Sequence, residues 1–164
     1  MYFLLYFLFL IVQRLSELVI SGKNELWLRS QGAIEYGKEH YPYIVALHIL
    51  FIASTGCEYY LREGVHFLPA FLVIFFILLV LKTWVIASLG HYWNTKILRV
   101  PNISPIKKGP YRFFRHPNYI IVIAELFVVP MVFDLYITAI VFSVLNGFIL
   151  YIRIKEENKV WRNE

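Results

Sequence analysis

Long apolar segments separated by polar loops constrain this chain more than any other feature. The longest, Phe67–Leu89, contains one charged residue, Lys82. About 20 apolar residues are enough for a helix to cross the hydrocarbon core of a bilayer. Apolar residues make up 59% of the 164-residue chain, against roughly 45–50% in soluble proteins. The chain therefore has the composition of an integral membrane protein.

Five segments have this character and are predicted to be helices that span or enter the membrane. They run from about Tyr2 to Ile20, Tyr43 to Leu61, Phe67 to Leu89, just after Pro117 to Phe133, and Leu135 to Ile154. The fourth is shorter than a usual span, so we expect it to be tilted or to cross only part of the bilayer. Only Asp134 separates the last two, which predicts an antiparallel hairpin. The expected fold class is all-α, a polytopic membrane helix bundle of about five transmembrane helices with a C-terminal helical hairpin.

Basic residues occur almost only in alternate loops. One side of the predicted membrane has thirteen: Lys23, Arg29, Lys38, Lys96, Arg99, Lys107, Lys108, Arg112, Arg115, Arg153, Lys155, Lys159 and Arg162. The other side has Arg62 alone. Because cytoplasmic loops are the basic ones, we expect the N-terminus outside and the C-terminus in the cytoplasm. This bias and contact with anionic lipid headgroups account for the net charge of +5, so nucleic acid is not an expected partner.

No repeat or linker divides the chain, so one domain is expected over residues 1–164. Residues 1–89 would form three N-terminal spans, residues 90–117 a basic loop, and residues 118–164 the helical hairpin and the C-terminal tail. Pro101, Pro105, Gly109 and Pro110 make a continuous helix in the loop unfavourable. The one cysteine, Cys57, excludes an internal disulfide.

The sequence Arg115-His116-Pro117 is typical of a helix N-terminus that binds an anion. Proline is tolerated in the first helical turn because the N–H that it lacks would have no partner there. The free N–H groups of that turn and the helix dipole favour a carboxylate or phosphate. This site would lie at the membrane surface, where a polar cofactor could meet a lipophilic substrate.

Asn146, Arg153 and Glu157 fall on one face of the last predicted helix, because their spacings are seven and four residues. Arg153 and Glu157 lie near the predicted cytoplasmic end, at the level of the loop that contains His116. One interpretation is that they form a surface ion pair; the other is that they belong to a site shared with that loop.

Several ionisable residues fall inside predicted spans, where charge is costly unless it faces protein or a water-filled cavity. They are Arg14, Glu17, His48, Glu58 and Glu125. Arg14 and Glu17 are expected to pair along one helix. For Glu125 we expect either a hydrogen bond to His48 or Asn146, which is slightly favoured, or a place in the substrate cavity.

Other classes of site are poorly supported. His91 and His116 have no acidic or thiol partners at metal-site spacing, so no metal is predicted. The chain has no P-loop, no Gly-x-Gly-x-x-Gly and no Gly-x-Ser-x-Gly sequence.

The C-terminal half resembles the isoprenylcysteine carboxyl methyltransferase family, in its short bacterial branch. The resemblance rests on Gly109-x-Tyr111-x-x-x-Arg115-His116-Pro117-x-Tyr119, the apolar hairpin and Arg153-x-x-x-Glu157. It implies a membrane-embedded methyltransferase that uses S-adenosylmethionine, with Arg153 on the substrate side and Glu157 on the cofactor side as the catalytic residues. The segment Ile103–Ile106 would also line the cofactor site. The predicted cofactor-binding residues are Ile106, Tyr111, Arg115, His116, Pro117, Asn118, Tyr119 and Glu157.

The resemblance implies transfer of a methyl group to a carboxyl or acidic hydroxyl oxygen of a lipophilic substrate. Isoprenylcysteine-like carboxylates and alkylpyrones with an acidic ring hydroxyl are plausible acceptors. Two alternatives stay open. One is a nicotinamide-dependent membrane reductase similar to sterol reductases, and the other is a non-enzymatic lipid-binding subunit. Membrane lipids are expected partners in every case, and the oligomeric state is not predicted.

Overall fold

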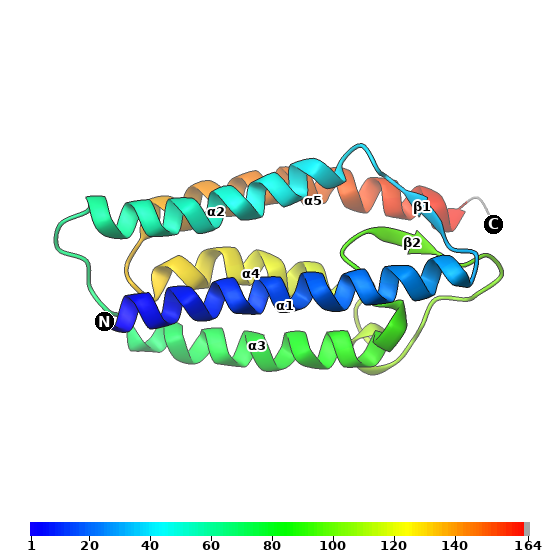
Figure 1. The fold of residues 1–164 in the computed structure, drawn as a ribbon, viewed down its shortest axis with the longest axis horizontal. Coiled ribbons are helices and arrows are strands. Elements are labelled where there is room, and N and C mark those ends of the chain that lie inside the picture. The colour runs from blue at the N-terminus through cyan, green and yellow to red at the C-terminus, as the bar shows by residue number, and fades with distance from the viewer. Residues whose placement is uncertain (163–164) are drawn as a thin grey trace.

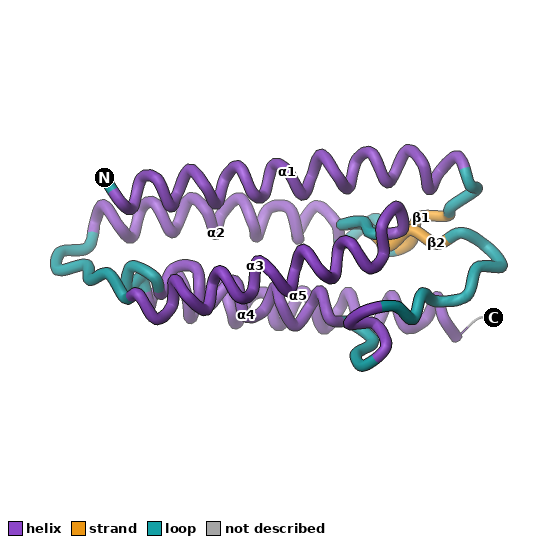
Figure 2. Tube along the Cα trace, turned by 90° about the horizontal axis from the view of Figure 1, so that it is seen from below, coloured by secondary structure: helices purple, strands orange, loops and turns teal. Residues whose placement is uncertain are grey.

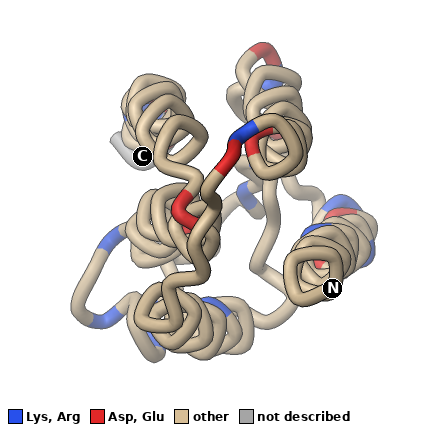
Figure 3. The backbone as a smooth tube through the Cα atoms, turned by 90° about the vertical axis from the view of Figure 1, so that its left-hand side faces the viewer, with Lys and Arg blue, Asp and Glu red and all other residues tan. Residues whose placement is uncertain are grey.

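The structure, a computed structural model, describes residues 1–162. These residues form five α-helices that lie along one long axis, with the N-terminus at one end and the last turns of the chain at the other (Figure 1). The helices are α1 (Tyr2–Ser30), α2 (Tyr41–Leu61), α3 (Pro69–Leu89), α4 (Pro117–Met131) and α5 (Tyr136–Arg162). Viewed along that axis, they form a bundle (Figure 3). The predicted all-α membrane bundle is confirmed.

Four of the helices are long and apolar enough to cross a membrane, namely α1, α2, α3 with the turn that follows it, and α5. Helix α4 has 15 residues and is the short one, as its sequence predicts. Three helices have proline in the first turn, at Pro42, Pro69 and Pro117. Proline favours a helix start because its backbone is preset for the first turn.

Two helices continue beyond their predicted ends. Helix α1 reaches Ser30 rather than Ile20, and α5 reaches Arg162 rather than Ile154. The added turns are polar but remain helical, and Arg29 pairs with Glu25 one turn earlier in α1. Both extensions lie at the basic end of the bundle, where helices can leave the bilayer. The last two residues of the predicted domain, 163–164, lie outside the described residues.

A small antiparallel sheet at this end was not predicted. Strand β1 (Ile34–Tyr36) pairs with β2 (Ile97–Arg99), with Glu35 opposite Leu98. The strands join the two longest polar loops beside the C-terminal part of α5 (Figure 2). Strands of three residues give too little alternation to be recognised in a sequence.

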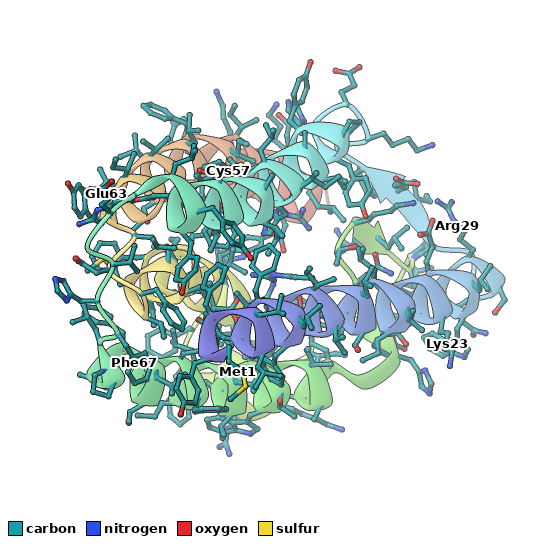
Figure 4. All side chains as sticks on the ribbon, turned by 60° about the vertical axis from the view of Figure 1, so that its left-hand side comes forward. Met1, Lys23, Arg29, Cys57, Glu63 and Phe67 are labelled. Carbon is teal, nitrogen blue, oxygen red and sulfur yellow. The ribbon has the colours of Figure 1, made fainter. Side chains whose placement is uncertain are left out.

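The loops divide between the ends of the bundle as the charge pattern predicts. Met1, Glu63 and Phe67 lie at one end, and Lys23 and Arg29 lie toward the other (Figure 4). Arg62, the basic residue of the opposite end, contacts the backbone carbonyl and the carboxylate of Asp134 in the hairpin turn.

The turn between α4 and α5 is supported by α2. Asp134 has a positive φ of 54°, a conformation that costs energy for residues other than glycine. The Glu58 carboxylate accepts hydrogen bonds from the N–H groups of Ile137 and Thr138, at 3.1 and 2.7 Å. An acidic group at a helix N-terminus satisfies free N–H groups and stabilises the helix dipole. Glu58 therefore has a structural role, although it lies in an apolar helix.

Four charged side chains form an intramembrane charge cluster between α1, α3 and α4. Arg14 lies 3.0 Å from both Glu17 and Glu125, and Lys82 lies 2.7 Å from Glu17 and 2.8 Å from Glu125. Lys82 and Glu125 are almost fully buried. Two positive and two negative charges cancel, which lowers the cost of burying each one.

This cluster confirms the expected Arg14–Glu17 pair and corrects the favoured prediction for Glu125. Glu125 binds Arg14 and Lys82, whereas the His48 ring bonds to the carbonyl of Ile44 within its own helix. The two cations outcompete a neutral imidazole or amide for a buried carboxylate because opposite charges attract strongly at low dielectric.

Removing one charge from the cluster should destabilise the bundle. We expect Glu125→Gln to lower the free energy of unfolding by about 3–5 kcal/mol, since it leaves a buried cation without a full counter-charge. Thermal unfolding of the purified protein in detergent measures this, with Glu63→Gln in an exposed loop as the control. The double variant Glu125→Gln, Lys82→Met should recover part of the loss. A Glu125→Gln midpoint equal to that of the wild type would contradict the account.

Candidate functional site

The first turn of α4 and the last turns of α5 meet at the basic end of the bundle. Helix α4 begins at Pro117, directly after His116, as the sequence predicts. Because α4 and α5 form a hairpin, the start of one lies beside the end of the other (Figure 1). This arrangement brings together two sequence motifs that are more than 30 residues apart.

The Tyr119 hydroxyl joins the two helices. It donates a hydrogen bond to the Glu157 carboxylate at 2.6 Å and accepts one from Nε of Arg153 at 2.8 Å. The Arg153 guanidinium also lies 5.5 Å from the centre of the Tyr119 ring. Bonds in which one partner is ionised are stronger than neutral ones, so these contacts fix the register of α4 against α5.

His116 completes this group, which we call the α4–α5 cluster: His116, Tyr119, Arg153 and Glu157. The His116 ring stacks on Tyr119 with 5.2 Å between ring centres, and its Nδ1 lies 3.6 Å from Glu157. Its other nitrogen, Nε2, is buried and has no hydrogen-bond partner among the described residues. Oδ1 of Asn118 and Oδ1 of Asn158 are also buried and have no hydrogen-bond partner among the described residues. Buried polar atoms are rarely left unpaired, so these three point to a ligand or water.

Arg153 is also bound from outside the hairpin. Its Nη2 donates to the backbone carbonyl of Thr95 at 2.6 Å. The side chain is only 9% exposed, so it is not part of a surface ion pair. These two bonds use two of the five N–H donors of the guanidinium, and the others can bind an oxyanion.

Gly109, in the loop before α4, has a packing reason to be glycine. Its φ is +52°, and a Cβ there would lie 2.1 Å from Oγ of Ser88. Glycine therefore allows the short 3-10 turn Gly109–Arg112 to approach α3 closely. Tyr111 lies in that turn, and burial and the nearby Glu157 carboxylate both raise the pKa of its hydroxyl.

Two polar side chains lie further along α5 from Arg153, Asn146 on the same face and Ser143 about 80° around the helix from Arg153. Asn146 is 2% exposed, and its Nδ2 has no hydrogen-bond partner in the described part of the chain. Oγ of Ser143, one turn further along, is also buried without a partner. Asn146 lies two turns, about 10 Å, from Arg153 along the helix.

The described residues contain no group of three or more His, Cys, Asp and Glu side chains that could bind a metal ion. In the α4–α5 cluster, the positive Arg153 guanidinium and the negative Glu157 carboxylate instead bind the same Tyr119 hydroxyl. Such a group can bind a ligand that has both a positive and a negative end.

A family model described as the isoprenylcysteine carboxyl methyltransferase (ICMT) family matches residues 71–162, more than half of the chain. The chain belongs to this family. It is therefore a membrane methyltransferase, and the matched segment includes all four residues of the α4–α5 cluster.

Two curated relatives match nearly the whole of this methyltransferase. The uncharacterized protein YpbQ of Bacillus subtilis is 41% identical over 152 residues, which cover 92% of this chain and 90% of the relative. An uncharacterized protein of Haemophilus influenzae is 28% identical over 148 residues, covering 88% and 86% of the two chains. No solved structure matches.

The methyltransferase brings some of the predicted site residues together and leaves others apart. His116, Tyr119, Arg153 and Glu157 are in direct contact. The two other predicted residues of the first α4 turn, Pro117 and Asn118, adjoin the cluster in sequence. Ile106 is half-buried in the loop, whereas Arg115 is exposed in the bend before α4.

Thr95 and Asn158 were not among the predicted residues. Thr95 contributes its backbone carbonyl, and because every residue has one, the residue type gives no sign of this role. Asn158 directly follows Glu157, and this adjacency was the one available sequence signal.

Removing the Tyr119 hydroxyl should loosen the link between the helices. The sequence resemblance implies S-adenosylmethionine as the cofactor. On that expectation, Tyr119→Phe should weaken its binding by about tenfold, because the charge-assisted hydrogen bonds of the hydroxyl to Glu157 and Arg153 are lost. Isothermal titration calorimetry of the detergent-purified protein measures the affinity. Tyr151→Phe, on an exposed part of α5, is the matched control. Equal affinity of Tyr119→Phe and the wild type would remove this hydroxyl from the cofactor site.

Proposed function

We propose that this methyltransferase uses S-adenosylmethionine to methylate a carboxyl or acidic hydroxyl oxygen of a lipophilic substrate. The observation that carries the proposal is the shared Tyr119 hydroxyl, which binds Arg153 and Glu157 at the start of α4. It joins the proline-started helix to an acid–base pair at the basic end of an apolar bundle. A polar donor and a membrane-soluble acceptor can meet there.

The residues around His116 suit the amino-acid end of the cofactor. The first turn of α4 offers the N–H of Asn118 and the positive end of the helix dipole to a carboxylate, since Pro117 has no N–H and the Tyr119 N–H bonds to the carbonyl of His116. Glu157 offers a negative charge to an ammonium group. The unpaired Nε2 of His116 and Oδ1 of Asn118 supply further buried polar atoms for the ligand. Tyr111 and Ile106, in the preceding loop, are the proposed contacts for the rest of the cofactor, with Arg115 at its exposed edge.

Arg153 is the proposed contact for the acceptor oxygen. Bound S-adenosylmethionine supplies an electrophilic methyl group on a positively charged sulfur. The guanidinium can bind a carboxylate through two parallel N–H groups, which keeps the oxygen deprotonated and orients it. Tyr119 and Thr95 fix the guanidinium, so little reorganisation is needed when the acceptor binds.

The apolar part of the substrate would lie among the helices. Asn146 on the Arg153 face of α5, and Ser143 beside that face, have buried polar atoms without a partner among the described residues, further along the helix than Arg153. An acceptor with a long apolar tail and an acidic head, such as an isoprenylcysteine-like carboxylate or an alkylpyrone, offers an acid to Arg153 and an apolar tail to the helices. Both curated relatives come from bacteria, which favours a bacterial plasma membrane with the basic end in the cytoplasm.

The test is methyl transfer from labelled S-adenosylmethionine in membranes that contain the protein. S-farnesylcysteine and an alkylpyrone with a ring hydroxyl are suitable acceptors. We expect Arg153→Ala to lower kcat/KM by about 100-fold or more, since a buried bidentate charge contact is lost. Arg153→Lys should recover little, because an ammonium lacks the planar fork.

Lys155→Ala is the matched control, since Lys155 is an exposed cation two residues away on the same helix. It should retain wild-type activity. Full activity of Arg153→Ala would exclude Arg153 from the reaction. A wild-type protein that binds no S-adenosylmethionine would contradict the proposed function as a whole.

A further inference from the structure

Helix α1 contacts the connector that binds Arg153, and the contact is made by polar groups. The connector is residues 93–96, between α3 and β2. Ser21 Oγ accepts a hydrogen bond from the Thr95 N–H at 3.1 Å and lies 2.8 Å from the Thr95 hydroxyl. Ser21 is 4% exposed, so water cannot easily replace these bonds.

Two asparagines and one lysine strengthen the same contact. Nδ2 of Asn24 donates to the backbone carbonyls of Trp93, at 2.7 Å, and Gly90, at 3.2 Å. Nδ2 of Asn94 donates to the carbonyl of Ser21 at 2.8 Å. Lys96 pairs with Glu25 of α1 at 2.8 Å, and this hydrogen bond raises the pKa of Lys96. Helix α1 therefore contacts the connector on both sides of Thr95.

Thr95 transmits this contact to the α4–α5 cluster. Its carbonyl accepts the bond from Nη2 of Arg153, while its N–H and hydroxyl bind Ser21. The Tyr41 hydroxyl of α2 lies 3.2 Å from the Thr95 hydroxyl and adds a weaker contact. The Thr95 carbonyl shares its peptide plane with the Lys96 N–H, which donates a hydrogen bond to Oδ1 of Asn94 at 2.8 Å. Ser21 holds the preceding peptide plane through the Thr95 N–H, so the backbone is fixed on both sides of the Thr95 Cα.

We infer that Ser21 and Asn24 are positioning residues for Arg153, so that α1 helps to orient the group that binds the acceptor. Ser21 acts through Thr95 itself, and Asn24 acts through the carbonyl of Trp93, two residues earlier in the connector. Neither contacts the Arg153 side chain directly in the hydrogen bonds of the described residues. Both lie outside residues 71–162, the segment that the family model matches. The inference rests on the proposed function for its kinetic consequences, but the orientation of Arg153 can be measured independently.

Two measurements on the purified full-length protein test the inference. The first is the steady-state kinetics of S-farnesylcysteine methylation. We expect Ser21→Ala to raise KM for the acceptor or lower kcat/KM by about three- to tenfold, the effect of losing a buried hydrogen bond. The affinity for S-adenosylhomocysteine should change less than the acceptor KM, because Arg153 bonds to the connector directly, whereas Glu157 is linked to it only through Tyr119 and Arg153 in the described structure. Ser21→Thr, which keeps a hydroxyl, should restore much of the loss.

The second measurement needs no activity. It is the rate at which phenylglyoxal modifies Arg153, followed by mass spectrometry of the α5 peptide. Ser21→Ala should raise this rate several-fold because the Arg153 side chain gains freedom. Thr95→Val, which keeps the carbonyl and removes the hydroxyl, should change it in the same direction. Ser16→Ala is the matched control, since Ser16 lies on an exposed face of the same helix.

The possible results separate the two proposals. A wild-type protein without methyl transfer, but with faster Arg153 modification in Ser21→Ala, would refute the function and keep the positioning role. Unchanged modification and unchanged acceptor KM in a folded Ser21→Ala protein would overturn the positioning role. If Ser21→Ala fails to fold, Asn24→Ala and Thr95→Val provide the same readouts, and no change in both would also overturn it.

Discussion

The hydroxyl of Tyr119 is the contact on which the proposed site depends. It bonds to a carboxylate and to a guanidinium of α5 at once, and it lies in the first turn of α4. Through it, two charged side chains of α5 bond to the first turn of α4, which His116 also joins by lying 3.6 Å from Glu157. The start of α4, the Glu157 carboxylate and the Arg153 guanidinium therefore meet around one hydroxyl group. The α4–α5 hairpin makes this possible, because it returns the chain to the same end of the bundle.

Inside a bilayer, polar groups have no water to bind, so they must bind other polar groups of the protein. The polar contacts in the rest of the bundle follow from this constraint. The intramembrane charge cluster is neutral as a whole and joins three helices. Glu58 stabilises the start of α5 at one end of the bundle, and Ser21 and Asn24 bind the connector at the other. The charged side chains of the cluster, Glu58, Ser21 and Asn24 therefore each have a partner in another segment.

The helices, the ends at which the loops lie and the start of α4 could be predicted from the sequence, because each depends on a local sequence pattern. Apolar length predicts the helices, alternate basic loops predict which loops share an end, and Arg115-His116-Pro117 predicts where α4 begins. The contact between Arg153, Glu157 and that turn follows from the short hairpin. The partner of Glu125 could not be predicted, because the choice among His48, Arg14 and Lys82 depends on how helices rotate against each other. The role of the Thr95 carbonyl could not be predicted for a different reason, since every residue type has a backbone carbonyl.

The most direct test of the account is photolabelling of the purified protein with radiolabelled S-adenosylmethionine, followed by mapping of the labelled peptides. The account predicts adducts in two segments, the loop and first α4 turn up to Tyr119 and the end of α5 around Glu157. Excess S-adenosylhomocysteine should abolish both. Adducts confined to residues 1–68, or none that S-adenosylhomocysteine can displace, would contradict the claim that α4 and α5 form the cofactor site.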